Sequence, residues 1–167
     1  MQPLEPPETH YLSAALGWAE LGNPAEARAE LAQIAAEHQV HPDVLEVRWL
    51  ICAQEGCWDE GLQVARSLLK EAPERASGWL HQSYALRRAA DGGVRKALEA
   101  LLPAMDLFPK EAIIPYNLSC YSCLLNDLDT ARLLFKRALA IGDKEKIKLM
   151  ASADSDLEPL WPELSGY

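Results

Sequence analysis

The turn Leu21-Gly22-Asn23-Pro24 separates two segments whose apolar residues recur at helical spacing, and it decides the fold because it returns along the chain. Gly56-Cys57-Trp58 holds the same place 34 residues later. After a slip of two residues the pattern resumes, and Asn126 stands where the two glycines stood. A period of about 34 residues is typical of helix-turn-helix units that stack, because one unit alone cannot bury its apolar face. The spacing therefore favours a binding scaffold over a catalyst.

The second helix of each unit carries a small residue where the two helices cross, and a second packing residue one turn later. The small set is Ala27, Gly61, Ala97 and Ala131, and the second set is Leu31, Ala65, Leu101 and Phe135. A small residue lets antiparallel helices approach, and the later residue fills the remaining space. Glycine or asparagine in the turn supplies the left-handed conformation that ends the first helix. Pro73 and Pro109 stop the second helices of two units.

Helical periodicity covers most of the chain, and no strand pattern competes with it. The predicted helices span residues 8–21, 24–38, 43–55, 58–71, 76–90, 94–108, 112–125 and 128–141. Pro103 lies inside the sixth of these. Because proline removes a hydrogen bond and costs about 3 kcal/mol in a helix interior, a kink is expected there.

This pattern resembles the tetratricopeptide repeat, which combines large, small and aromatic positions in its first helix with an alanine, a Phe or Leu and a closing proline. The matching units are residues 8–41, 42–75, 76–111 and 112–143. The chain departs from the pattern at Gln39 and Asp143, where proline is usual, and at the insertion Asp91-Gly92-Gly93. The resemblance implies an all-α fold, an α-solenoid of about four TPR helix-turn-helix repeats in a right-handed superhelix.

The last repeat and the tail are similar to the terminal, end-of-group unit of many bacterial tetratricopeptide proteins. The likeness rests on Tyr116-Asn117-Leu118-Ser119-Cys120-Tyr121 and on the segment from Asp154 to Trp161. A terminal repeat exposes a face that the next repeat would cover, so a solenoid needs a cap. Residues 144–167 are therefore expected to form a capping helix and tail, with Ile147, Leu149, Met150, Leu157, Leu160 and Trp161 as its apolar residues. The alternative is a loose tail.

The net charge of the chain indicates which classes of partner it would repel. The chain has 16 basic and 25 acidic residues and a formal net charge of −9, which repels phosphate backbones and acidic membranes. We therefore expect no nucleic-acid partner and no membrane partner, and no apolar stretch reaches the length of about 18 residues that a span needs. Residues 1–7 lack the basic start and apolar run of a secretion signal. They are predicted to be a disordered, proline-rich leader of a cytoplasmic protein.

Four cysteines form the one chemistry-like cluster: Cys52, Cys57, Cys120 and Cys123. A redox C-x-x-C places one thiol at a helix N-terminus beside a strand, whereas Cys120 and Cys123 are predicted to lie in mid-helix. A zinc site needs four ligands. Buried or half-buried packing is the favoured interpretation, with no metal and no cofactor. A metal-binding or redox protein using Cys120 and Cys123 stays as the alternative. No phosphate-binding loop or nucleophile elbow occurs in the sequence, so no enzyme activity is expected.

The resemblance implies that the first helix of each repeat lines a concave groove. In repeats one and two the register places Leu12, Leu16 and Leu50 there, with an acidic rim. Repeats three and four contribute an aromatic and basic set: His81, Tyr84, Arg87, Arg88, Tyr116 and Asn117. Planar donors, an amide and rigid rings suit an extended peptide with an acidic side chain or a free carboxylate. The competing interpretation is that the tyrosines pack between helices and that the arginines pair with acids of the chain.

The known carboxylate clamp of this family is not matched. Its positions hold Leu12, Leu16, Val47, Ser77 and His81 here, or, one repeat on, Glu46, Leu50, His81, Ile113 and Asn117. The sequence thus predicts a non-catalytic adaptor that binds a protein or peptide partner in another way. A homo-oligomer, formed through the exposed face of repeat one or the Trp161 tail, remains a further alternative.

Overall fold

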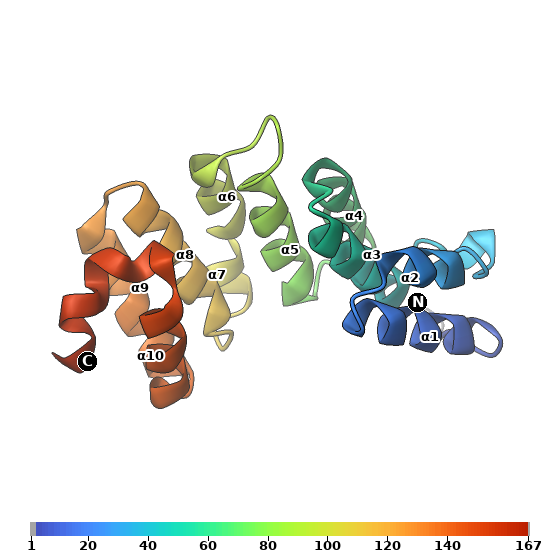
Figure 1. Cartoon of the computed structure of the whole chain (residues 1–167). Helices are drawn as coiled ribbons and strands as arrows, with labels where there is room; N and C mark the ends of the chain where they lie inside the picture. Colours follow the sequence, from blue (N-terminus) through green and yellow to red (C-terminus); the bar gives the residue numbers. More distant parts are fainter. Residues whose placement is uncertain (1–2, 167) are drawn as a thin grey trace. The chain divides into compact units, whose positions relative to one another are not determined.

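The computed structural model describes residues 3–166, and within that range every regular element is a helix (Figure 1). The chain divides into two compact units, with the boundary between Asp91 and Gly92. We call them the N-terminal unit and the C-terminal unit and describe each by itself. The boundary falls within the Asp91-Gly92-Gly93 insertion, so the two main helices of the third repeat belong to different units.

The N-terminal unit contains two helix pairs and a fifth long helix. Its elements are α1 (Glu8–Glu20), α2 (Pro24–Leu31), the short 3-10 helix η1 (Ala36–His38), α3 (Pro42–Glu55), α4 (Trp58–Glu71) and α5 (Ala76–Leu86). Helix α1 packs on α2 and α3, and α4 packs on α3 and α5. Asn23 caps α2 by accepting a hydrogen bond from the backbone N–H of Glu26. Gly56 ends α3 at φ 70°, the left-handed conformation that the turn pattern predicts.

The C-terminal unit is built around α8. Its elements are α6 (Val94–Leu101), α7 (Ala104–Leu107), α8 (Ile113–Leu124), α9 (Leu128–Ile141), α10 (Lys144–Ala153) and the 3-10 segment η2 (Ser155–Gly166). Helices α6 and α9 and segment η2 pack on α8. Asn126 has φ 62° in the turn between α8 and α9, so asparagine replaces glycine in the left-handed position as predicted.

The alternation of small and filling residues is confirmed in both units. Ala27, Ala97 and Ala131 are completely buried, and so are the later residues Leu101, Phe135 and Ala65. At Gly61 an added Cβ would lie 3.4 Å from the Cβ of Cys52 and 3.8 Å from the indole nitrogen of Trp49. Because Gly61 has no side chain, α4 leaves room at this position for Cys52 and the large Trp49 of α3.

Two helices end earlier than the periodicity predicts. Helix α2 ends at Leu31 rather than at residue 38, because the side-chain amide of Gln39 donates to the carbonyls of Leu31 and Ile34, at 2.8 and 2.6 Å. These bonds satisfy acceptors that a continuing helix would have used. Helix α5 ends at Leu86 rather than at residue 90, where the backbone N–H of Ala90 donates to Asp59 instead (3.1 Å).

Pro103 does more than kink its helix. Helix α6 ends at Leu101, and α7 begins only at Ala104. The predicted single helix over residues 94–108 is therefore wrong. Pro103 itself adopts the N-cap position of α7, where the missing N–H costs nothing because no helical partner exists for it.

The predicted capping helix is present as α10, and η2 follows it. Leu157 and Leu160 of η2 are completely buried. The indole N–H of Trp161 donates to the carbonyl of Ala151 (2.8 Å), and Arg132 of α9 pairs with Glu163 (2.9 Å). The tail is thus packed on the last repeat rather than loose.

The leader is only partly described. Residues 1–2, and Tyr167 at the other end, lie outside the described residues, so the disorder predicted for residues 1–7 stays a prediction. Within residues 3–7, Leu4 packs against the core of the N-terminal unit. None of the helices within residues 3–166 is both long and apolar enough to span a bilayer.

Candidate functional site

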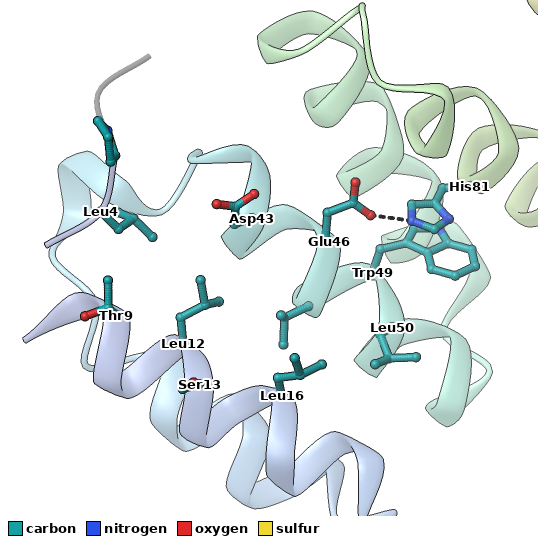
Figure 2. A pocket seen from close by; sticks show the side chains of 12 residues that line it. Leu4, Thr9, Leu12, Ser13, Leu16, Asp43, Glu46, Trp49, Leu50 and His81 are labelled. Carbon is teal, nitrogen blue, oxygen red and sulfur yellow. Dashed lines mark hydrogen bonds and ion pairs between the residues drawn. The ribbon is translucent and has the colours of Figure 1, made fainter. Parts of the chain in front are cut away.

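A groove of about 650 Å³ opens in the N-terminal unit, and we call it the N-terminal groove (Figure 2). Helices α1 and α3 form its walls, and α5 and the leader each contribute at an end. Its lining is Pro3, Leu4, Thr9, Leu12, Ser13, Leu16, Asp43, Glu46, Val47, Trp49, Leu50 and His81. The volume lies within the range of about 300–1,000 Å³ that is usual for ligand sites.

The floor of the groove is made of leucines. Leu12 and Leu16 follow each other at one-turn spacing on α1, so they share one face of that helix. Leu50 comes from α3. Leu12 and Leu50 pack partly on the core, while Leu16 keeps 39% of its surface exposed. These side chains therefore offer apolar surface that the unit itself does not cover.

Polar side chains stand at the end of the groove formed by α3 and α5. His81 Nε2 lies 2.7 Å from Glu46 Oε2 (Figure 2), and the Ser77 hydroxyl also donates to Glu46. Burial acts to raise the pKa of Glu46, but the hydrogen bonds from His81 and Ser77 and the charges of His81 and Arg75 outweigh it, so the pKa lies below its ordinary value. Arg75 pairs with Asp43 (2.7 Å). Both acids that line the groove are thus held by partners within the chain.

Aromatic rings surround this polar end. The His81 ring stacks on Trp49 with centroids 3.8 Å apart and an angle of 10°. Tyr84 meets Trp49 edge-on at 5.9 Å. The guanidinium of Arg88 lies over Tyr84 at 3.7 Å, and 5.1 Å from the Trp58 ring centroid. Arg88 therefore makes cation–π contacts with rings of its own chain, and Tyr84 is 37% exposed.

The sequence-predicted site residues fall in both units. Leu12, Leu16, Leu50 and His81 line the N-terminal groove. Tyr84, Arg87 and Arg88 follow on α5 and its C-terminal end, with both arginines half-buried. Tyr116 and Asn117 belong to α8 of the C-terminal unit. The role of all of these residues in binding stays a prediction.

Tyr116 is tied to the C-terminal cap. The residue is 4% exposed, its ring centroid lies 6.5 Å from that of Phe135, and its hydroxyl donates to Asp154 (3.0 Å). Burial, together with the nearby Cys120 and Asp154, raises the pKa of Tyr116 well above its ordinary range. The packing interpretation of this tyrosine is the one that its surroundings support.

The cysteines are free thiols, and Cys52, Cys120 and Cys123 are buried as predicted. Cys57 is exposed, so the prediction of burial is wrong for this residue. It precedes α4 as its N-cap residue and so lies in the turn between α3 and α4 rather than inside a helix. Burial raises the pKa of Cys52 and Cys123 to about 11, and it raises the pKa of Cys120 further. Raised pKa values keep these three thiols protonated, which disfavours nucleophilic or redox chemistry.

A set of possible metal donors surrounds Cys120. The thiol donates to Asp154 Oδ2 (3.5 Å), and the donor atoms of Cys120, Asp154 and Asp156 lie within 4.8 Å of one another. Cys123, the partner that the C-x-x-C spacing suggests, is not part of this set. Asp154 also accepts hydrogen bonds from the backbone N–H of Asp156 and from Tyr116. These hydrogen bonds satisfy the Asp154 carboxylate, which links α8 to the cap.

Sequence reasoning did not include three groove-lining residues, Pro3, Leu4 and Trp49, among the groove positions. Trp49 has a repeat-core position, but its large ring extends past the core to the groove. Pro3 and Leu4 precede the first repeat, so the repeat register assigns them no place. A leucine within a proline-rich segment was the available signal.

Comparison with known proteins supports the fold. No protein-family model and no curated protein matches the sequence. Among solved structures, the chain is similar to TTC0263, a thermophilic TPR protein of Thermus thermophilus, with a TM-score of 0.73 and 22% identity over 94% of this chain and 82% of that one.

Two structures of MamA are also similar. A double mutant of the RS-1 protein matches with a TM-score of 0.68 and 19% identity over 89% of this chain and 78% of that chain. The AMB-1 protein matches with a TM-score of 0.64 and 17% identity over 95% and 88%. Taken with the helix pairs, the left-handed turns and the buried small residues, these likenesses show that the chain has the tetratricopeptide-repeat fold.

Proposed function

We propose that this chain is a non-catalytic protein-interaction module that binds a segment of a partner protein in the N-terminal groove. The observation that carries the proposal is the leucine floor of a groove of about 650 Å³, in which Leu16 is 39% exposed. Burying apolar surface yields about 25 cal/mol per Å², so a partner that covers this floor gains affinity from it.

The polar groups of the groove support binding rather than catalysis. Glu46 is held by His81 and Ser77, and Asp43 by Arg75. Groups fixed in this way give the groove a defined shape and orient a bound chain. They also reduce the repulsion that two unpaired acids would exert on an acidic partner. A cytoplasmic location belongs to the same proposal.

The finer hypothesis of an acidic partner depends on α5. Arg88 stacks on Tyr84 beside the groove wall formed by Trp49 and His81. A guanidinium held flat against a ring is pre-oriented to bind a carboxylate in a bidentate manner. We propose that Arg88, with Arg87 next to it, receives an acidic side chain or free carboxylate of the partner. For Tyr116 and Asn117, which belong to the other unit, a role in binding stays a prediction.

A matched pair of leucines tests the groove. Leu16 lies in the groove, whereas Leu21 lies in the turn after α1 and is 78% exposed. Partners are captured with the unaltered chain, identified by mass spectrometry and purified, and their Kd is measured by calorimetry. Leu16→Glu is expected to weaken binding at least about tenfold, or about 1.4 kcal/mol, and Leu21→Glu to leave it unchanged. Equal Kd values for both variants would refute the proposal.

Self-assembly is the second candidate. Leu133 on α9 and Leu149 on α10 are 70% and 73% exposed, and exposed leucines of this kind occur at contacts between copies. Light scattering of the unaltered chain and of the Leu133→Glu variant distinguishes the candidates. A mass of one chain at high concentration would eliminate self-assembly.

A further inference from the structure

Residues 3–5 form a strap at one end of the N-terminal groove. Pro3 and Leu4 line the groove directly. Figure 2 shows Leu4 at the end opposite His81, near Thr9 and Asp43. Among residues 3–7, Leu4 is the one that is partly buried, and it packs against the same core cluster as Leu12 and Leu50. The strap thus places one leucine of the chain on the leucine floor that the proposed partner would cover.

The strap is joined to α1 by a backbone hydrogen bond. The Glu5 carbonyl accepts a hydrogen bond from the backbone N–H of Thr9, at 3.3 Å. A second hollow of about 440 Å³ is lined by Pro3, Glu5, Glu8 and His38. Leu4 is the one partly buried side chain of residues 3–5, so a partner has to replace the contacts of a single leucine. Residues 3–5 precede α1, so displacing Leu4 does not require a helix to unwind.

The sequence of the strap indicates which kind of peptide segment fits the groove. Leu4 follows Pro3, and Glu5 precedes Pro6. Proline fixes its own φ and biases the preceding residue toward extended backbone, so Pro3 and Glu5, on either side of Leu4, favour an extended segment. Glu5 points its charge to solvent as an exposed residue, and the nearest groove acid, Asp43, is paired with Arg75.

We infer that the strap is a built-in competitor of the groove, and that the partner is an extended protein segment that presents a proline-flanked leucine and displaces Leu4. This inference rests on the proposed function because it concerns the same groove. The inference goes beyond the proposed function because it names the side chain that the partner supplies and the contact that must break first. The strap lowers the affinity of the groove for weak apolar ligands and is replaced by a segment that makes more contacts.

A fluorescein-labelled peptide with the sequence of residues 1–7 serves as the probe, and fluorescence anisotropy gives its Kd. The full chain carrying Leu4→Ser is expected to bind the peptide about tenfold more tightly than the unaltered chain. A tethered strap has an effective concentration of about 1 mM, which produces that factor when the isolated segment binds with a Kd of about 0.1 mM. A peptide in which serine replaces the leucine is expected not to bind.

Two further variants make the result specific. Leu4→Ser combined with Leu12→Ala is expected to lose the gain, because the floor is reduced. Leu21→Ser, at an exposed leucine outside the groove, is expected to match the unaltered chain. Equal affinities of the unaltered chain and Leu4→Ser, binding that survives Leu12→Ala, or no peptide binding to any variant would each overturn the inference. None of these outcomes affects the partner measurement with Leu16→Glu, so failure of the inference and failure of the proposed function remain distinguishable.

Discussion

Leu160 is completely buried where η2 packs against α8, α9 and α10, so Leu160→Ala tests whether the cap stabilises the C-terminal unit. The change removes three carbon atoms from the packed side chain. At about 0.8 kcal/mol per buried CH₂ the transfer loss is roughly 2.5 kcal/mol, and a residual cavity adds to it. The cap lies at the edge of the unit, where it can partly collapse, so we expect a total of about 3 kcal/mol.

The assay must report on the C-terminal unit alone. Hydrogen exchange followed by mass spectrometry resolves peptides of α8 and α9, whose amides exchange when the cap opens or the unit unfolds. Leu160→Ala is expected to speed their exchange about a hundredfold, the factor that corresponds to about 3 kcal/mol. Leu149, which is 73% exposed on α10, provides the control Leu149→Ala with unchanged exchange. Equal protection of α8 and α9 in the two variants would show that the cap contributes nothing to stability.

Two other predictions concern packing and charge. Gly142→Ala places a Cβ 2.7 Å from the Cδ1 of Ile147 and is expected to destabilise the chain by about 1–3 kcal/mol in urea unfolding. Gly17 lies inside α1, and a Cβ added there meets no atom within 4 Å. Gly17→Ala is therefore expected to stabilise the chain by about 0.5–1 kcal/mol. If both changes shift the urea midpoint equally, the close approach at Gly142 is unimportant. The folded pKa of Glu46 lies below its ordinary value of 4.5, so its contribution to stability is present above about pH 4.5 and is lost as the pH falls through the lowered pKa. The Tm of the unaltered chain should therefore fall more steeply between pH 5 and pH 3 than that of Glu46→Gln, and parallel curves would contradict this assignment.

The helix pairs could be predicted because their causes are local. Gly56 and Asn126 adopt the left-handed turns that the repeat pattern requires, and Ala27 and Ala131 are buried at the crossings. The early end of α2 had no such signal. It depends on Gln39 reaching back to the carbonyls of Leu31 and Ile34, and a glutamine in place of the usual proline does not indicate where its side chain goes. A helix end that is set by a long side chain therefore could not be predicted from the repeat pattern.

The candidate site was predictable to a similar extent. The repeat register identifies Leu12, Leu16 and Leu50, because residues at fixed spacing on a helix share a face. It gives no information about contacts outside the repeats. The hydroxyl of Tyr116 meets Asp154, and Leu4 meets the groove. Both contacts join a repeat to a flanking segment with its own sequence, and neither follows from the periodicity.

The two flanking segments meet the same physical problem in different ways. An outer repeat leaves an apolar face without a neighbour, and water contact with that face is unfavourable. In the C-terminal unit, η2 covers α8 with two completely buried leucines, and the Arg132–Glu163 pair holds it in place. In the N-terminal unit, residues 3–5 cover part of the leucine floor with Leu4, which is only partly buried.

This difference in burial indicates a difference in role. Removing the η2 leucines from their sites exposes two complete side chains, so the cap remains closed while the unit is folded. Leu4 is a single, partly buried side chain, and an incoming leucine can regain the contacts that it loses. The partly buried cover therefore lies at the groove that we propose as the binding site, and the completely buried cover lies in the unit where burial serves stability.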